Sequence, residues 1–563
     1  MKRIQWIGKG IIALFLMMVF LWTQGYPLEK NSSIQAPSSS LSPLIKRRIT
    51  GWTTAPRTVI KGERIYSPVL VESFYKGRKY EPAWSRQDHL EQADMLIMAI
   101  EGAYGDGLTP DYYHLQLLKS LISKVRRERE SPDPVHLIEV DILLTDAFLT
   151  LGCHLSAGCV EPATLEPEWF AKAESVDVSS VLEQALENKR IREALAGLLP
   201  EQDAYVRLSH ALAGYRELLS KGEWPPVSDG PLMKKGSRST RVAELRKRLA
   251  VSCDLEADKA KGGDLFEEKL EGSVIIFQKR HGLQIDGIVG PETLTALNVP
   301  LKQRIRQIEL NMERLRWVGG SLGPRSVVIN IANFRLDALE GGISVLSMKV
   351  VVGKPYWDTP VFSARMTHLV LNPSWNAPDS IAKKELLKKI KRDPHYLSKQ
   401  NITVLRGWGN DEEEIDSETV DWQRITPKNL IYRFRQEPGM LNPLGRIKFM
   451  LPNKFDVYLH DTPAKRLFTE HVRTFSHGCI RIEKPIELAE YVLRGDPAWT
   501  QEKFLAALEE GDEQIVRISH PVNVHFLYLT AWVDEQGTLQ FRNDIYGRDK
   551  RLDEALLKRA HTP

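Results

Sequence analysis

Cysteine is scarce in this chain of 563 residues, which contains four. Four cysteines are too few for disulfide bonds to carry the fold of a protein of this size. Cys153 and Cys159 could pair across the end of a helix, but cysteine is also a common small buried residue. Charge of either sign is in little excess, and a net charge of +4 gives no indication of nucleic-acid binding.

A single hydrophobic core is excluded by the length, because one core stops growing near roughly 250 to 300 residues. We therefore expect two to four domains. Hydrophobic residues make up 42% of the chain and charged residues 27%, as in an ordinary globular protein.

The first 27 residues have the composition of an export segment. Lys2 and Arg3 precede an uncharged apolar run from Ile11 to Trp22. A run of about a dozen residues falls short of the roughly 20 that span a bilayer, which favours a secretory signal peptide. Ile4 to Ile7 could extend it into an anchor, and a buried N-terminal helix is the remaining alternative. We expect residues 1–27 to be a signal peptide or a signal anchor.

Two regions follow that carry no recognisable chemistry. Residues 28–60 are rich in Ser and Pro and have no apolar period, which predicts a tether. Residues 61–232 carry apolar side chains at spacings of three and four, which predicts a helical scaffold domain. Its clearest helices run from Leu90 to Tyr104 and from Val135 to Leu155.

A compact three-helix unit is predicted for residues 237–298. Glycines permit a tight turn before its third helix, which runs from Glu292 to Leu297. The runs Phe277-Gln278 and Asp286 to Pro291 resemble the small three-helix peptidoglycan-binding module. The resemblance implies three residues of the binding signature: Asp286, Gly287 and Gly290. Alternatively, these residues only determine the turn, and binding has been lost.

The pattern changes from helix to strand after a basic helix, Gln303 to Trp317. Five short runs enriched in β-branched and aromatic residues predict strands: Val327 to Ile331, Val345 to Val352, His368 to Leu371, Ile447 to Leu451 and Val457 to His460. We expect a mainly β domain over residues 301–521. Residues 522–563 return to strands and a closing helix, which we expect to pack on the same domain.

A long insertion, residues 376–445, interrupts the β domain. It holds Lys- and Glu-rich helical stretches and an acidic run from Asp411 to Asp416. Insertions of this length are uncommon in compact domains unless they are functional or disordered, so we predict a helical lid over the site. A decorative surface insertion is the alternative.

Cys479 is the candidate nucleophile. A thiol attacks only as the thiolate, so a nucleophilic cysteine needs a base or a cation beside it and partial exposure. His460 lies nineteen residues upstream, at the end of a predicted strand, and this separation allows two adjacent strand ends to meet. We expect His460 to be the general base, with a carbonyl or hydroxyl near Asp461 or Thr462 fixing its tautomer.

Residues around this pair are candidates for substrate binding and charge stabilisation. His477 would point the same way as the nucleophile in an extended segment and polarise the site or bind substrate. Gly478 allows close approach, and the amides of Gly478 and Cys479 could face a developing oxyanion. Arg481 offers a fork of donors suited to a substrate carboxylate. Tyr458 and Ser476 are expected to line the substrate groove.

The ordered combination of His-Asp-Thr-Pro at 460–463 and Ser-His-Gly-Cys-Ile-Arg at 476–481 resembles the L,D-transpeptidase (YkuD-type) catalytic domain. The wider pattern resembles the large periplasmic members of that family, which carry a helical scaffold and an internal peptidoglycan-binding module. Some large members have serine where this chain has His477. The resemblance covers roughly residues 60 to 550.

The resemblance implies a cysteine acyltransferase that acts on peptidoglycan stem peptides. Cys479 would attack the carbonyl of the third residue, diaminopimelate, of a tetrapeptide stem, expel the terminal D-alanine and form a thioester. The side-chain amine of another stem would then give a 3→3 cross-link. Water would instead give a tripeptide, as in an L,D-carboxypeptidase, and a free D-amino acid would give exchange.

The same resemblance implies a periplasmic protein that takes part in cell-wall biogenesis, needs no cofactor and is acylated by carbapenems. Its expected partners are the donor and acceptor stems and other cell-wall enzymes.

Two rival hypotheses remain. A zinc site would draw on His460, Asp461, His471, His477 and Cys479, which lie within twenty residues. No H-E-x-x-H occurs, however, and a His-x-Cys spacing is tighter than usual zinc-ligand spacings. The other hypothesis is a non-catalytic peptidoglycan-binding scaffold, against which the joint presence of the cysteine, both histidines, the glycine and the arginine argues.

Overall fold

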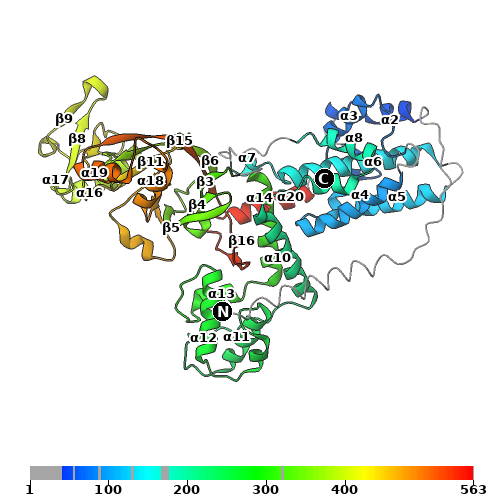
Figure 1. Cartoon of the computed structure of the whole chain (residues 1–563), viewed down its shortest axis with the longest axis horizontal. Coiled ribbons are helices and arrows are strands. Elements are labelled where there is room, and N and C mark those ends of the chain that lie inside the picture. Colours follow the sequence, from blue (N-terminus) through cyan, green and yellow to red (C-terminus); the bar gives the residue numbers. More distant parts are fainter. Residues whose placement is uncertain are drawn as a thin grey trace.

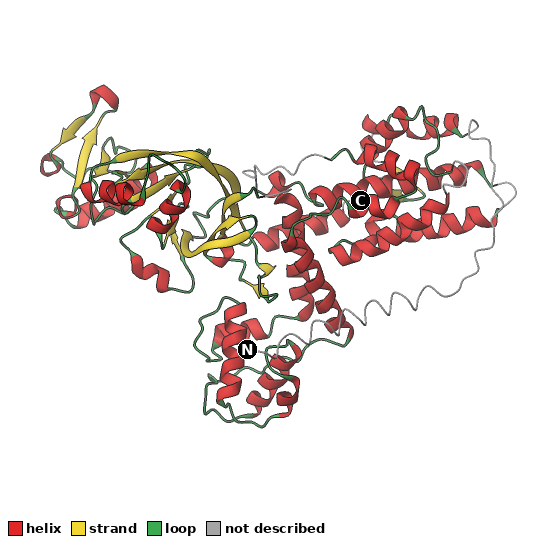
Figure 2. Ribbon diagram, in the orientation of Figure 1, coloured by secondary structure: helices red, strands yellow, loops and turns green. Residues whose placement is uncertain are grey.

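The computed structural model describes residues 41–54, 58–85, 90–128, 132–166, 176–318 and 322–561. The predicted export segment, residues 1–27, lies outside these ranges. Figures 1 and 2 show a helical body, a small helical module and a sheet-containing body, which meet around two long helices, α10 (Asp203–Ser220) and α14 (Leu301–Val318). The predicted multi-domain class is therefore confirmed. None of the helices in the described ranges is both long and apolar enough to cross a membrane.

The helical body is built around α6 (Pro134–Ala157), which is buried on nearly every side. A helix that is apolar all round must lie inside a larger body rather than on its surface. Asp133 caps it, because its carboxylate accepts from the Val135 amide. The surrounding helices are α2 (Ser42–Ile49), α3 (Pro68–Gly77), α4 (Leu90–Gly102), α5 (Leu115–Arg127), α7 (Pro162–Leu165), α8 (Val178–Asn188) and α9 (Ile191–Ala196). The two predicted helices correspond to α4 and α6 and are confirmed.

The predicted tether at 28–60 is wrong from Leu41 onward, and its first part, residues 28–40, lies outside the described ranges. Residues from Ser42 form α2, and its side chains Ile45 and Ile49 are fully buried in the helical body with Leu41 and Trp52. These four apolar residues recur at spacings of four, four and three, which is a helical face. The preceding Ser- and Pro-rich run obscured this short pattern.

The small module consists of three helices around its own apolar core. They are α11 (Thr240–Val251), α12 (Glu268–Arg280) and α13 (Pro291–Leu297). Leu245 and Leu249 from the first helix pack with Val274 and Phe277 from the second.

A nine-stranded sheet forms the β domain. Its order is β13-β5-β14-β12-β11-β6-β15-β3-β4, and β4 also pairs with β5, so the sheet closes on itself. The strands are β3 (Arg325–Asn330), β4 (Arg335–Glu340), β5 (Ile343–Gly353), β6 (Phe362–Leu371), β11 (Ile447–Met450), β12 (Leu459–His460), β13 (Thr474–Ser476), β14 (Ile480–Ile482) and β15 (Gln514–Leu527). Two helices, α18 (Pro485–Leu493) and α19 (Gln501–Glu510), contribute Leu488 and Phe504 to the core of the sheet.

The insertion at 376–445 is a folded subdomain of strands and short helices, which corrects the prediction of a helical lid. It contains a four-stranded sheet in the order β7-β10-β8-β9. Its elements are β7 (Trp375–Asn376), α15 (Asp379–Ile381), a π-helical turn (Ala382–Leu386), α16 (Leu387–Arg392), α17 (Tyr396–Lys399), β8 (Ile402–Arg406), β9 (Glu413–Ile415) and β10 (Arg433–Gln436). Leu386, Ile390, Trp422 and Phe434 form a separate apolar core. The insertion therefore folds around a core of its own.

The C-terminal segment does not pack on the β domain alone, which corrects the prediction for 522–563. The strand from Val522 continues β15 in the main sheet, as expected. However, the hairpin of β16 (Ala531–Val533) and β17 (Leu539–Phe541) shares a core with α10 and α14. The last helix, α20 (Arg548–His561), lies beside α14 and buries Leu552 in the helical body (Figure 1).

Helix α14 likewise belongs to both bodies, although the sequence placed it in the β domain. Its Leu310 and Trp317 join the core of the helical body. The Glu313 carboxylate accepts from the amides of Cys159 and Val160, at the end of α6. A helical period marks which residues are buried but not which domain buries them.

Candidate active site

The candidate site lies on one face of two neighbouring strands. Strands β12 and β14 pair in parallel, with Leu459 opposite Ile480 and His460 opposite Arg481. Leu459 and Ile480 are fully buried in the core of the sheet. Since side chains alternate along a strand, His460, Arg481 and Cys479 share the opposite face.

The nucleophile segment crosses the end of a third strand. Strand β13 pairs with one edge of β5 and β14 with the other, so residues 477–479 pass over the end of β5 at Gly353. A Cβ on Gly353 would lie 1.9 Å from the Trp357 carbonyl oxygen. Gly478 has φ +113°, a conformation that glycine adopts without strain. Gly353 and Gly478 therefore permit residues 477–479 to pass closely over the end of β5, which places Cys479 beside that strand end.

Cys479 is half-buried and contacts residues 456 and 458, which lead into β12. Its Sγ lies 3.7 Å from the Asp456 carbonyl oxygen. Burial raises the thiol pKa above its usual value, and hydrogen bonding to Tyr458 and the charges of Lys448 and Arg481 oppose that rise only in part. The resting group at neutral pH is therefore the thiol, not the thiolate.

His460 is buried and neutral. Its Nδ1–H donates to the Asp461 carbonyl oxygen at 2.5 Å, which leaves Nε2 as the acceptor. The predicted tautomer-fixing carbonyl near Asp461 is confirmed. Burial, followed by the charges of Arg481 and Lys448, lowers the pKa of His460 to about 3. A neutral imidazole is free to accept a proton at physiological pH, although its burial makes the protonated form costly.

Tyr458 lies close to both predicted partners. Its phenol hydrogen bonds to Cys479, and burial is the main cause that raises the tyrosine pKa. The Tyr458 and His460 ring centroids are 5.7 Å apart. The structure thus brings Cys479 and His460 to one face, with the Tyr458 ring in contact with both.

Lys448 is a site residue that the sequence analysis missed. It lies on β11 directly opposite His460, and its Nζ is 4.1 Å from the centre of the Tyr458 ring. Burial lowers the pKa of this lysine, and the nearby Cys479 opposes the effect. The alternation of Ile447, Lys448 and Phe449 was the available signal, since it places the lysine on the face away from the core.

His477 does not lie in an extended segment, which corrects that prediction, because residues 477–479 bend at Gly478. Its Nε2 lies 2.6 Å from Glu385 Oε1, on the π-helical turn of the insertion. Its ring centroid lies 4.1 Å from that of Trp357. The positive φ of Gly478 turns the chain between the two residues. His477 therefore connects the nucleophile segment to the insertion.

Ser476 and Gly478 bond to each other instead of facing a groove. The Gly478 amide donates to Ser476 Oγ at 3.2 Å, and Ser476 is 2% exposed. The Gly478 amide is thus engaged in this state, contrary to the predicted oxyanion contact, and Ser476 is too buried to line a groove. Arg481 differs, because its Nε is buried without a hydrogen-bond partner among the described residues.

In the small module, the signature residues hold a turn. Gln278 Nε2 donates to Asp286 Oδ1 at 2.9 Å, and the same oxygen accepts from the Ile288 amide. Gln278 Oε1 accepts from the Gly287 amide. Gly290 precedes α13 with extended backbone. These contacts agree with the turn-forming alternative for Asp286 and Gly287.

The zinc hypothesis finds no geometric support. Within the part of the chain that the structure describes, no group of three or more His, Cys, Asp or Glu side chains is arranged to hold a metal ion. All four cysteines lie in that part, and Cys153 and Cys159 are not joined by a disulfide.

Comparison with known families agrees with this geometry. Residues 324–499, which include both strands of the site, match the family described as the L,D-transpeptidase catalytic domain. This part of the chain is similar to L,D-transpeptidase catalytic domains. Residues 69–212 match a scaffold domain, and residues 238–297 match the family described as "Putative peptidoglycan binding domain". The family resemblance predicted from the motifs is confirmed.

One curated relative matches part of this chain. A protein of Haemophilus influenzae named "Putative L,D-transpeptidase" is 33% identical over 250 residues, which are 44% of this chain and 49% of the relative. The match thus spans about half of that relative's length.

Solved structures give only weak likenesses. An L,D-transpeptidase from Mycobacterium smegmatis is 12% identical over 37% of this chain and 60% of its own, with a TM-score of 0.18. An L,D-transpeptidase from Stackebrandtia nassauensis is 13% identical over 54% of this chain and 96% of its own, with a TM-score of 0.20. At these TM-scores neither likeness adds to the family match.

Proposed function

We propose that this protein is a periplasmic peptidoglycan L,D-transpeptidase that forms 3→3 cross-links through a thioester on Cys479. One observation carries the proposal: Cys479 and His460 lie on the same face of two paired strands. His460 is neutral there, and the hydrogen bond from its Nδ1 fixes its tautomer. A thiol and a neutral imidazole are the components of a cysteine acyl-transfer site.

Acylation proceeds with proton transfer, because the resting group is a thiol. The sulfur of Cys479 attacks the carbonyl carbon of the third stem residue, and its proton passes to Nε2 of His460. The C–N bond to the terminal D-alanine then breaks. The departing amine takes the proton back from His460, and the acyl group stays on sulfur as a thioester.

Positive charge around the sulfur supports this step. Lys448 and Arg481 both act electrostatically on Cys479. As negative charge moves from sulfur to the carbonyl oxygen, these cations and the Cys479 amide stabilise it. Arg481 also has a buried Nε without a partner among the described residues, which suits it to a carboxylate of the stem peptide.

The acceptor determines the product. An amine from a second stem gives the 3→3 cross-link, whereas water gives L,D-carboxypeptidase activity and a free D-amino acid gives exchange. The insertion reaches the nucleophile segment through the contact of Glu385 with His477. A folded lid at this place limits the access of water to the thioester, which favours the amine.

Replacement of the nucleophile tests the proposal. Cys479→Ala is expected to abolish formation of cross-linked dimers from purified tetrapeptide muropeptides while binding of the protein to isolated sacculi persists. Cys253→Ala is the matched control, because Cys253 is an exposed thiol in the small module. Cross-linking that survives in Cys479→Ala rejects the mechanism, and inactivity of the wild-type chain with full sacculus binding favours the non-catalytic scaffold.

A further inference from the structure

The C-terminal residues 544–551, which we call the strap, reach the loop that follows β5. Tyr546 lies 8% exposed at the centre of this contact. Its hydroxyl donates to the Gly353 carbonyl oxygen at 2.6 Å and accepts from the Thr359 amide at 3.4 Å. One phenol oxygen therefore joins the two ends of the loop over which the nucleophile segment passes.

Thr359 connects this loop to the residue before the nucleophile. Its Oγ1 donates to the Gly478 carbonyl oxygen at 2.8 Å and accepts from the Gly353 amide at 3.0 Å. The side chain is fully buried. Tyr546 and Thr359 thus fix the Gly478 carbonyl, and with it the peptide unit that carries the Cys479 amide.

Arg548 extends the connection to the scaffold domain. Its Nη2 donates to the Thr359 carbonyl oxygen at 3.0 Å and to Asp358 Oδ2 at 2.9 Å. Its Nε lies 3.2 Å from Oε1 of Glu166, which follows α7, and Arg551 pairs with the same oxygen at 3.5 Å. A single guanidinium, 4% exposed, therefore bridges the scaffold domain and the loop at the active site.

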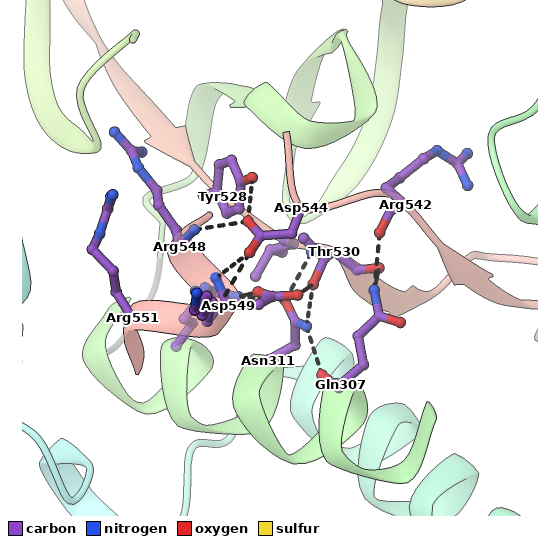
Figure 3. Close-up of polar contacts among 12 residues, drawn as sticks. Gln307, Asn311, Tyr528, Thr530, Arg542, Asp544, Arg548, Asp549 and Arg551 are labelled. Atoms are coloured by element: carbon purple, nitrogen blue, oxygen red, sulfur yellow. Dashed lines mark hydrogen bonds and ion pairs between the residues drawn. The ribbon is translucent and has the colours of Figure 1, made fainter. Parts of the chain in front are cut away.

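The strap is held firmly at its base. Asp544 accepts from the Tyr528 hydroxyl at 2.7 Å and from the Arg548 amide at 2.8 Å (Figure 3). Asp549 pairs with Arg314 of α14 and accepts from the Thr530 hydroxyl. The strap includes the first turn of α20, and the next residue of this helix, Leu552, is buried in the core of the scaffold domain. Its position therefore follows the position of the scaffold domain.

We propose that the strap positions the nucleophile segment and couples it to the docking of the scaffold domain, with Tyr546 and Arg548 as positioning residues and Glu166 as the scaffold contact. This role of the strap rests on the proposed function, because the group that it positions is the Cys479 nucleophile. Small displacements of a reacting group are costly, so release of this loop lowers turnover without removing any group that touches substrate.

Tyr546→Phe in the full-length chain tests the first link, because it removes one oxygen and keeps the ring. Tyr491→Phe is the matched control: this buried tyrosine donates to the Leu339 carbonyl oxygen at 3.0 Å in the same core, away from the nucleophile segment. Amide hydrogen exchange in residues 474–482 is expected to rise about tenfold in Tyr546→Phe and to stay unchanged in the control. In turnover assays kcat is expected to fall about tenfold with KM unchanged.

Glu166→Gln tests the second link, with the exposed neighbour Glu161→Gln as control. Faster exchange in residues 474–482 and a lower kcat are expected only in Glu166→Gln. Unchanged exchange in Tyr546→Phe, or equal changes in both tyrosine variants, overturns the strap. Unchanged exchange in Glu166→Gln overturns the coupling to the scaffold. A wild-type chain without turnover that shows the expected exchange pattern rejects the proposed function and leaves the strap in place.

Discussion

The thiol of Cys479 is protonated at rest, and its reactivity should show this. Burial raises its pKa, whereas Lys448 opposes the rise. We expect the rate of alkylation by iodoacetamide to increase with pH and to reach its midpoint above the usual cysteine pKa. Lys448→Met should move that midpoint further upward, because a cation that stabilises the thiolate is lost. Mass spectrometry of the peptide that contains Cys479, after alkylation at a series of pH values, measures the midpoint in the wild type and in Lys448→Met. A midpoint below pH 7 would instead indicate a resting thiolate–imidazolium pair.

His460 should make stability depend on pH. Its pKa is lowered from 6.5 to about 3 in the folded chain. Between these values the unfolded chain binds a proton that the folded chain does not, so the stability that neutral His460 contributes is full above pH 6.5 and is lost as pH falls. The expected slope is about 1.4 kcal/mol per pH unit.

His460→Gln removes that proton difference and is the variant for comparison. Urea unfolding of both proteins between pH 4 and pH 7 measures the effect. The gap in unfolding free energy between wild type and variant should narrow as pH falls, and a gap independent of pH would contradict a buried neutral histidine.

At this scale the sequence motifs located the face of the site but not every contact on it. Cys479, His460 and Tyr458 follow from strand alternation and lie together. The orientation of His477 did not follow, because it depends on the positive φ at Gly478 and on Glu385, which is far away in the sequence. Lys448 was missed because a lone lysine in a strand is usually a solvated residue.

Among the structural elements, the end of β5 controls the path of the nucleophile segment. Gly353→Ala would place a methyl group against the Trp357 carbonyl oxygen, so backbone must move. We expect a loss of roughly 1–3 kcal/mol in unfolding free energy, together with loss of turnover.

Gly272→Ala in α12 is the matched control, since its Cβ meets nothing within 4 Å. Alanine in a helix interior should stabilise that site by roughly 0.5–1 kcal/mol. Thermal unfolding compares the stability of Gly353→Ala and Gly272→Ala, and a cross-linking assay compares their activity. An active, undisturbed Gly353→Ala would show that the crossing tolerates a side chain.

Most helices and strands followed from their periodicity, because each buries one face or one stripe. The insertion was placed by its length, but its separate core around Trp422 and Phe434 was not predicted. The helix α2 was hidden, since eight residues beside a Ser- and Pro-rich run give too short a pattern to stand out. The periodicity of apolar residues predicts which face of a helix or strand is buried, but not which other element that face packs against.

At the scale of the whole molecule, α14 and α20 contact both the scaffold and the catalytic domains, and we expect the two domains to unfold as one unit. Leu552 of α20 is 1% exposed within the scaffold core, although the strap before it binds the catalytic domain. Leu552→Ala should cost roughly 2–5 kcal/mol through the cavity that it leaves. Leu557→Ala, on the exposed side of the same helix, should cost little.

Calorimetry distinguishes a joined unit from independent domains. We expect the scaffold and catalytic domains to unfold together in the wild type, and Leu552→Ala to separate their transitions. Separate transitions in the wild type would contradict the joining role of α20.

In the proposed mechanism Cys479 carries the acyl group. Intact-mass measurement after brief incubation with a tetrapeptide stem and an acid quench detects that group. We expect an adduct equal to the stem without its terminal D-alanine, mapped to Cys479 and removed by hydroxylamine, and a carbapenem should label the same residue. Release of D-alanine by the Cys479→Ala variant, or turnover by the wild type through an adduct on another residue, would contradict it.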